Sequence, residues 1–337
     1  MRESLLEIQD LHVHYTTEGK IVKAVNGVSL HLDRGETLGI VGETGAGKST
    51  TALSIMRLIQ TPPGNYANGK ILFKGENLLA LKETDMKKIR GNEISMIFQD
   101  PMTSLNPVYT VGDQIAEVIW THEKVTKEKA RKKAGSILEL VGIPAERGAE
   151  YPHEFSGGMR QRVVIAIALA CNPELLIADE PTTALDVTIQ AQVLELMKKL
   201  KEELNTAMIL ITHDLGVVAE VCDNVAIMYA GEIVEYGTVE DIFNEPSHPY
   251  TKGLFDSIPK LDVRSKRLKP IKGLMPDPTD LPTGCIFHPR CPFSIERCQK
   301  EAPLAYKKGD IHHVACHLFD EYPIKGGEVS EEGAAKV

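Results

Sequence analysis

One segment near the N-terminus restricts the possible fold of this chain more than any other feature. Residues 42–50, GETGAGKST, fit the pattern G-x-x-x-x-G-K-[ST] of a phosphate-binding loop. An apolar stretch at 36–41 predicts a short strand before the loop, and residues 48–60 predict a helix after it. This strand, loop and helix favour a nucleotide-binding α/β fold over the alternative, a glycine-rich turn that happens to contain a lysine.

Each part of this loop has an expected task. Glycines let the backbone bend so that several N–H groups point at one anion, and the helix N-terminus adds its positive dipole end. The Lys48 ammonium supplies charge for the β- and γ-phosphates, and the Ser49 hydroxyl is a ligand for Mg²⁺. The nucleotide-binding candidates in the loop are Gly42, Glu43, Thr44, Gly45, Ala46, Gly47, Lys48, Ser49 and Thr50.

Polar residues follow three apolar segments that predict buried strands. Gln99 follows 94–98, Asp179 and Glu180 follow 174–178, and His213 follows 207–212. Ligands of α/β sheets bind at the carboxyl ends of the strands. We expect Asp179 to hold Mg²⁺ through its water shell and Glu180 to orient or deprotonate an attacking water. Gln99 can reach Mg²⁺ or a water near a γ-phosphate, or it is a strand-end cap, and His213 is equally compatible with a structural role.

Two weaker signals lie elsewhere in the chain. Ser156 can cap a helix that continues to Ala170, and the glycines at 157 and 158 leave the first N–H groups of that helix open to an anion. The alternative is an ordinary serine cap. Tyr15 ends the first predicted strand, at 5–15, where it can stack on an adenine or pack across strands.

Composition excludes several classes of protein. The chain has 38 Lys and Arg against 47 Asp and Glu, a net charge of −9, so general affinity for nucleic acid is not expected. No apolar run approaches the ~18 residues of a membrane span, and the N-terminus has no signal-peptide pattern, so we expect a cytosolic protein. Apolar periodicity over 111–142 predicts two or three helices inserted into a mixed α/β core.

These parts occur in the order and spacing of a known family. Over about residues 5–240 the chain resembles the ATP-binding subunits of ABC transporters, through Tyr15, GETGAGKST, Gln99, SGGMRQR at 156–162, LLIADE at 175–180, Ala184-Leu185-Asp186 and His213. The remaining segment resembles one branch, the dipeptide/oligopeptide importers. That likeness rests on PSHPYT at 246–251, Gly284-Cys285, HPRCP at 288–292 and VACH at 314–317. Nickel and other small-solute importers share this tail.

The resemblance implies an α/β fold. We expect a P-loop NTPase (ABC ATPase) core with an antiparallel β subdomain and an α-helical subdomain at about 101–165, plus a small Cys-rich C-terminal region. The ATPase domain would span 1–245 and the oligopeptide-transporter-type extension 246–337. Residues 246–284, rich in Pro, Gly and basic residues, predict an extended connector.

The resemblance also implies a role for each motif. Tyr15 would stack on adenine, Glu180 would be the general base, and His213 would hold the γ-phosphate. Ser156, Gly157 and Gly158 would contact the γ-phosphate bound by a partner ATPase, and Asp186 would lie in the loop that crosses the dimer interface. The expected catalytic residues are Glu180, His213, Gln99 and Lys48. The expected Mg²⁺ ligands are Ser49, Gln99 and Asp179. Phe155 and Met159 replace the family's usual Leu and Gln without removing N–H donors.

One copy of each motif implies a second ATPase subunit, for which we expect a paralogue. The resemblance further implies two transmembrane permease subunits, indirect contact with an extracytoplasmic binding protein, and a peripheral position on the cytoplasmic face of the membrane. Soluble ABC ATPases that act on DNA carry a large insertion, whereas only 56 residues separate Gln99 from Ser156 here. Ribosome-associated factors fuse two ATPase units, and exporters often carry their own membrane helices. The transported solute stays open.

Four cysteines crowd into the C-terminal region with the spacing C-x5-C-x6-C-x17-C: Cys285, Cys291, Cys298 and Cys316. This is not the C-x2-C pairing of common zinc folds, and four thiolates can hold a [4Fe–4S] cluster. Zinc bound by Cys₄ or Cys₃His is the main alternative because His288, His312, His313 and His317 are near in sequence. Four thiols without a metal are the third possibility.

Overall fold

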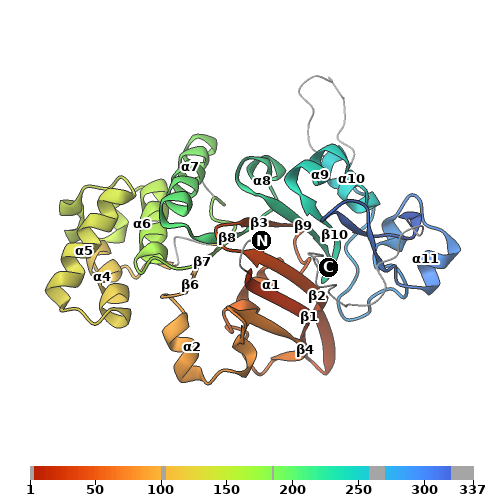
Figure 1. Cartoon of the computed structure of the whole chain (residues 1–337), viewed down its shortest axis with the longest axis horizontal. Coiled ribbons are helices and arrows are strands. Elements are labelled where there is room, and N and C mark those ends of the chain that lie inside the picture. Colours follow the sequence, from red (N-terminus) through yellow and green to blue (C-terminus); the bar gives the residue numbers. More distant parts are fainter. Residues whose placement is uncertain (1–3, 100–103, 184–185, 258–269, 320–337) are drawn as a thin grey trace. The chain divides into compact units, whose positions relative to one another are not determined.

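The structure, a computed structural model, describes residues 4–99, 104–183, 186–257 and 270–319. It divides into two compact units, each assembled from separate stretches of the chain (Figure 1). The first unit comprises Met1–Leu5, Leu32–Thr37 and Leu78–Thr212. The second comprises Leu6–His31, Leu38–Asn77 and His213–Val337. The proposed boundary at 245/246 stays a prediction.

Three parallel strands form the centre of the first unit, in the order β8-β7-β6. They are β6 (Ile94–Ile97), β7 (Leu175–Asp179) and β8 (Ala207–Thr212). Every residue of β7 and β8 is buried, which explains their continuous apolar sequence, as in sheets covered on both faces. Because the strands are parallel, the segments that follow β6 and β7 leave the sheet at the same edge.

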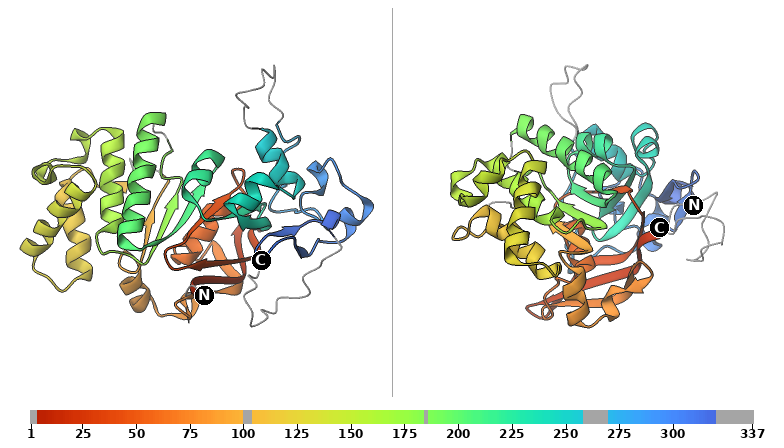
Figure 2. Two further views of the ribbon diagram at one scale, coloured as in Figure 1. Left: turned by 45° about the horizontal axis from the view of Figure 1, so that its top comes forward. Right: turned by 60° about the vertical axis from the view of Figure 1, so that its left-hand side comes forward.

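Helices make up the rest of the first unit. The region expected to be helical forms α4 (Val111–His122) and α5 (Lys127–Leu140), each capped by a threonine before its first residue. These two helices and α6 (Gly157–Leu169) lie side by side in all three views (Figures 1 and 2). The remaining elements are η1 (Leu78–Ala80), α2 (Glu83–Ile89), η2 (Ala145–Ala149), η3 (Pro152–Glu154) and α7 (Val187–Leu204).

The second unit contains an antiparallel sheet in the order β2-β1-β4-β5. Its strands are β1 (Ser4–Thr17), β2 (Lys20–Asp33), β4 (Gly64–Phe73) and β5 (Glu76–Asn77). Alternating burial along β1 and β2 matches the alternating sequence, because one face of the sheet packs on the core. The two strands expected at 5–15 and 21–32 are therefore confirmed, each slightly longer than predicted.

The other strands of this unit run in the order β11-β12-β10-β9-β3. They are β3 (Thr37–Val41), β9 (Asn224–Tyr229), β10 (Glu232–Thr238), β11 (Ala305–Lys307) and β12 (His313–Ala315). The helices of the unit are α1 (Lys48–Ile55), α8 (Leu215–Val221), α9 (Val239–Asn244), α10 (Pro249–Asp256), α11 (Glu296–Lys300), η4 (His288–Arg290) and η5 (His317–Phe319). Helix α1 ends five residues before the predicted end at Gln60, because Arg57 adopts a left-handed backbone with φ 49°.

The C-terminal region packs more tightly than the sequence predicted. An extended connector at 246–284 is wrong for Pro249–Asp256, which forms α10 with Pro249 in its first turn and His248 as its cap. Strand β12 also adds to the edge of β10. Phe287 is 1% exposed in a core cluster that includes Tyr229 and Tyr250, so this region contributes large apolar side chains to the core. In the described ranges, no helix is long and apolar enough to cross a membrane.

Candidate functional site

The phosphate-binding loop of the second unit adopts a shape that its glycines make possible. A Cβ on Gly42 would lie 2.1 Å from the carbonyl oxygen of Met228 on β9. Gly47 has φ 102°, and a Cβ there would lie 2.4 Å from the carbonyl oxygen of Ala24. Neither position accepts a larger residue without backbone movement. The loop therefore lies directly against two strands of its own unit.

Lys48 and Ser49 begin helix α1 at the end of this loop. The Lys48 side chain is buried, and its Nζ donates to the carbonyl oxygens of Gly42 at 2.7 Å and Glu43 at 3.0 Å. The ammonium thus lies inside the loop, where it can exchange these carbonyls for phosphate oxygens. Ser49 is exposed on the first turn, whose N–H groups have no partner within a helix. The arrangement is that of an anion site.

Two other nucleotide candidates belong to the second unit. Tyr15 lies near the end of β1 opposite Gly64 of β4, and its side chain is half-buried. His213 is exposed and follows the last residue of β8. The next residue, Asp214, caps α8 by accepting the N–H of Gly216 at 2.8 Å.

The first unit brings Gln99 and Glu180 together, as expected for residues that follow adjacent parallel strands. Gln99 Nε2 donates to Glu180 Oε2 at 2.9 Å, and Thr183 Oγ1 donates to the same oxygen at 3.0 Å. Asp179, the last residue of β7, is 5% exposed, whereas Glu180 is half-buried. The two carboxylates therefore lie at different depths, which suits two different tasks.

Glu180 has an unusual backbone conformation. Its φ is 47°, in the left-handed region that non-glycine residues seldom adopt, and its N–H donates to Ile211 of β8 at 2.9 Å. Strained backbone of this kind is found preferentially at functional sites. The conformation fixes the direction in which the carboxylate leaves the strand end.

Helix α6 begins as the sequence predicted. Ser156 is its N-cap, and its Oγ accepts the N–H of Met159 at 3.4 Å. Ser156 and Gly157 are exposed, and a Cβ on Gly158 would lie 2.5 Å from Cγ2 of Ile189 on α7. The second glycine is thus required for packing within the chain, whatever the exposed N–H groups bind.

The candidates divide between the two units. The loop at 42–50, Tyr15 and His213 belong to the second unit; Gln99, Ser156, Gly157, Gly158, Asp179, Glu180 and Asp186 belong to the first. Asp186 caps α7 by accepting the N–H of Ile189 at 3.0 Å. Residues 184 and 185, which precede it in the family motif, lie outside the described residues.

Sequence reasoning missed three residues that contact the candidates. Thr183 bonds to Glu180, Tyr250 accepts the N–H of Glu43 at 2.9 Å, and Arg290 forms an ion pair with the Glu43 carboxylate. A hydroxyl three residues after the strand-end carboxylate was a local signal for Thr183. The other two lie more than 200 residues from Glu43 in sequence, and only an acidic residue in the loop and a basic one in HPRCP hinted at the pair.

The four C-terminal cysteines share one neighbourhood of the second unit. Burial raises the pKa of Cys285 to about 11 and of Cys316 to about 12, and the nearby thiols of the other cysteines add to both shifts. Cys298 is also buried, and Cys291 is half-buried. Across the described residues, no three His, Cys, Asp or Glu side chains converge closely enough to hold a metal ion.

Comparison with known proteins shows which families the chain resembles. The family model for ABC transporters matches residues 25–183, and the model for the oligopeptide/dipeptide transporter C-terminal region matches 234–298. The oligopeptide transport ATP-binding protein OppD of Bacillus subtilis (strain 168) is 56% identical over 94% of this chain and 89% of its own length. The dipeptide transport ATP-binding protein DppD of the same organism is 53% identical over 98% of this chain and all of its own length.

Solved structures agree on the fold. The dimeric structure of MJ0796, a bacterial ABC transporter cassette, has a TM-score of 0.63 and 28% identity over 70% of this chain and 99% of its own. This chain is an ABC-type ATPase, a class whose expected ligands are ATP and Mg²⁺. Within that class it belongs to the family of dipeptide and oligopeptide transport ATP-binding proteins.

Proposed function

We propose that this chain hydrolyses ATP to power the import of dipeptides or oligopeptides through an ABC transporter. The observation that carries the ATPase part is Glu180, which has a left-handed backbone and accepts hydrogen bonds from Gln99 and Thr183. The choice of peptides rests on the match of residues 234–298 to the oligopeptide/dipeptide transporter region and on relatives that transport peptides. Nickel or another small solute is the alternative cargo.

Each candidate residue would have its own task in ATP hydrolysis. In the second unit, Tyr15 stacks on adenine, the loop at 42–50 and Lys48 bind the phosphates, and His213 donates to the γ-phosphate. In the first, Glu180 accepts the proton of the attacking water and Gln99 orients that carboxylate. Ser49, Gln99 and Asp179 would hold Mg²⁺, which neutralises charge on the β- and γ-phosphates when bound.

We further propose that the exposed N-terminus of α6 serves a second ATPase subunit. Ser156, Gly157 and Gly158 would contact the γ-phosphate held by that subunit, and Asp186 would lie at the interface between the two. One copy of each motif makes a paired subunit necessary for a complete site, and a paralogue is our proposal. ATP then favours the closed pair, and hydrolysis removes that preference.

The remaining partners follow from the same proposal. Two permease subunits would hold the chain at the cytoplasmic face of the membrane, and an extracytoplasmic binding protein would act through them. The ATPase domain would span 1–245, with its helical subdomain at about 101–165, and the extension 246–337. A tagged purification from detergent-solubilised membranes should recover two multi-span chains and a second ATPase. Recovery with ribosomes or nucleic acid would contradict the transporter assignment.

The variant Glu180→Gln tests the ATPase proposal. Removing the base should lower turnover of the assembled ATPase pair at least about 100-fold, while ATP still binds and keeps the pair closed. ATPase rate and gel filtration with ATP measure the two effects. Glu139→Gln, on the exposed side of α5, is the matched control and should behave as the native chain. Turnover in Glu180→Gln within twofold of the native value would refute the assignment.

We also propose that Cys285, Cys291, Cys298 and Cys316 hold a structural [4Fe–4S] cluster, with Zn²⁺ as the alternative. The other cysteine thiols contribute to the raised pKa of Cys285 and of Cys316, which supports four donors within one neighbourhood. To bind the cluster, the four thiols would have to lie closer together than they do in the structure. Anaerobic purification should yield a brown protein with about four irons per chain. A colourless protein with one zinc would replace the cluster by zinc, and a metal-free protein would refute both.

A further inference from the structure

Glu43, the second residue of the phosphate-binding loop, is held on three sides by its own chain. Its backbone N–H donates to the hydroxyl of Tyr250 at 2.9 Å. Its carbonyl oxygen accepts from Lys48, and its carboxylate accepts two hydrogen bonds from Arg290. Of these partners only Lys48 belongs to the loop; the others come from the C-terminal third of the chain.

The Arg290 side chain is positioned as part of a fixed structure. It is 5% exposed, and its Nη1 and Nη2 donate to the two oxygens of Glu43 at 2.6 and 3.1 Å. Its Nε donates to the carbonyl oxygen of Lys272 at 3.0 Å, and Nη1 also lies 3.4 Å from the Tyr229 hydroxyl. A bidentate ion pair of this kind fixes the orientation of the two side chains as well as the distance between them, because the guanidinium and the carboxylate are both planar.

A cluster of three aromatic rings packs around the side chains that contact Glu43. The rings of Tyr229 and Tyr250 are 4.7 Å apart, and Phe287 lies 5.1 Å from Tyr229 and 5.5 Å from Tyr250. All three side chains are less than 2% exposed. The Arg290 guanidinium lies 5.7 Å from the centre of the Tyr229 ring. The side chains that grip Glu43 therefore have little freedom to move.

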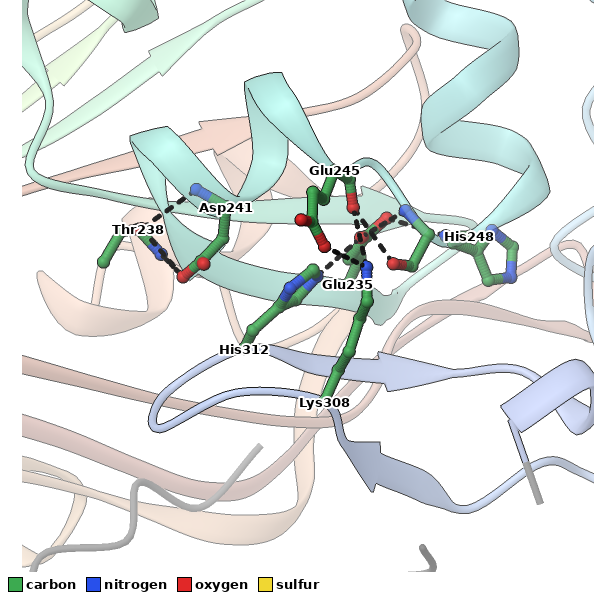
Figure 3. Close-up of polar contacts among 8 residues, drawn as sticks. Glu235, Thr238, Asp241, Glu245, His248, Lys308 and His312 are labelled. Atoms are coloured by element: carbon green, nitrogen blue, oxygen red, sulfur yellow. Dashed lines mark hydrogen bonds and ion pairs between the residues drawn. The ribbon is translucent and has the colours of Figure 1, made fainter. Parts of the chain in front are cut away.

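The C-terminal region is itself anchored to β10 at a second place (Figure 3). Buried Glu235 accepts the N–H groups of Ser247 and His248 just before α10. Nε2 of His312, which precedes β12, lies 2.8 Å from Oε1 of the same carboxylate. Lys308 adds an ion pair to Glu245 at 2.9 Å. These contacts fix the start of α10, the helix from which Tyr250 reaches the loop.

We propose that Arg290 is a positioning residue for ATP: through Glu43 it holds the phosphate-binding loop in its binding shape, so the C-terminal extension sets nucleotide affinity. The proposal rests on the function of the loop as the ATP site. When phosphates arrive, Lys48 turns from the loop carbonyls to the phosphate oxygens, and the loop loses two internal bonds. Arg290 and Tyr250 keep their hold on Glu43, so the loop needs no reordering. Such preorganisation lowers the entropic cost of binding.

The test measures the dissociation constant of Mg-ADP for the full-length chain, because ADP probes the loop without a partner subunit. Arg290→Gln should weaken ADP binding about tenfold, and Arg290→Lys, which keeps the charge but loses the fork, should fall between. Glu43→Gln should match Arg290→Gln. The double variant should be no weaker than the worse single one, because both remove one interaction. In the assembled ATPase pair the KM for ATP should rise while kcat stays within about twofold.

Arg297→Gln is the matched control. Arg297 also precedes a cysteine and forms an ion pair, but it lies on α11 and its partner is the exposed Glu301 just after that helix. The ADP affinity of the Arg297→Gln variant should therefore be native. If Arg290→Gln does not fold, Glu43→Gln carries the test, since its side chain is 32% exposed. Affinities within twofold of native in the folded variants, or effects that multiply in the double variant, would overturn the inference. A native chain that does not bind ADP would instead refute the proposed ATP site.

Discussion

Gly47 immediately precedes helix α1 and Gly157 begins helix α6, and both N-termini are candidates to bind phosphate, yet their surroundings differ. The loop before α1 is pressed against Met228 and tied to Tyr250 and Arg290 through Glu43. The start of α6 carries a serine cap and leaves Ser156 and Gly157 exposed. The first N-terminus is completed by its own chain, and the second presents its donors outward.

Under the function proposed above, this difference explains how one chain would bind nucleotide and still depend on a partner for hydrolysis. A loop held by its own unit is ordered before ATP arrives, so we expect the single chain to bind nucleotide without a partner. In the proposed pair, the exposed N-terminus of α6 would gain its ligand when the other subunit brings one. Each half of the comparison makes a separate prediction.

The largest effect is expected at Gly42. A Cβ there would meet the Met228 carbonyl oxygen at 2.1 Å, so Gly42→Ala should cost about 3 kcal/mol or more of unfolding free energy and abolish ADP binding. Urea unfolding and ADP titration measure both. Gly19→Ala is the control: its φ of 77° costs about 1–2 kcal/mol, but no atom lies within 4 Å. Equal losses in both variants would mean that close packing does not constrain the loop.

Ser156→Ala tests the other half of the comparison. The single chain should bind ADP with native affinity and lose only about 1 kcal/mol of stability from the missing cap. The assembled pair should lose ATPase activity by at least about tenfold, because a hydrogen bond to a charged phosphate disappears. A weaker ADP affinity in the isolated chain would show that α6 belongs to the same chain's binding site and would erase the contrast between the helices.

Acid should loosen the C-terminal region that supports the phosphate-binding loop. Burial lowers the pKa of His248 from 6.5 to about 4, so between these values the unfolded chain binds a proton that the folded chain does not. Stability should therefore fall as the pH falls from about 6.5 to about 4. Burial opposes ionisation of Glu235, but hydrogen bonds from His312, Thr251, His248 and Ser247 outweigh it and lower its pKa below 4.5, so its contribution to stability is lost as the pH falls below about 4.5.

Urea unfolding at several pH values measures this slope. His248→Asn keeps a side chain able to cap α10 but cannot take up the proton, so its slope should be smaller. Burial also lowers the pKa of His313 to about 4, which should leave part of the slope in the variant. A variant with the native slope would mean that His248 is not the group responsible.

The sequence predicted the parts of the site that depend on local pattern. The phosphate-binding loop and the Ser156 cap follow from short motifs, and the position of Gln99 and Glu180 at one sheet edge follows from the parallel strands. The hydrogen bond between these two side chains was not predicted. Contacts between residues distant in sequence carry no such pattern. Arg290 reaches Glu43 across 247 positions, and His312 reaches Glu235 across 77.

Two local features of the structure could not be predicted from the sequence, because each depends on tertiary contacts. Helix α10 has only eight residues and lies in a stretch rich in proline, so its sequence was interpreted as part of an extended connector. Its helical state depends on burial of Tyr250 against Tyr229 and Phe287, which is tertiary packing. The left-handed backbone of Glu180 is set by β8 through the bond to Ile211, not by the residue type.

The smallest effect is expected at Thr183, which bears on neither helix N-terminus. Thr183→Val removes one donor to Glu180 and leaves Gln99 in place, so kcat of the assembled pair should fall about fivefold, the value of one ordinary hydrogen bond. ADP affinity of the single chain and KM for ATP should stay native, because in the proposed mechanism the Glu180 carboxylate acts on water and not on the nucleotide. Thr121→Val, exposed on α4, is the matched control. A native kcat in Thr183→Val would mean that Gln99 alone orients Glu180, and a raised KM would tie this edge of the first unit to nucleotide binding as well.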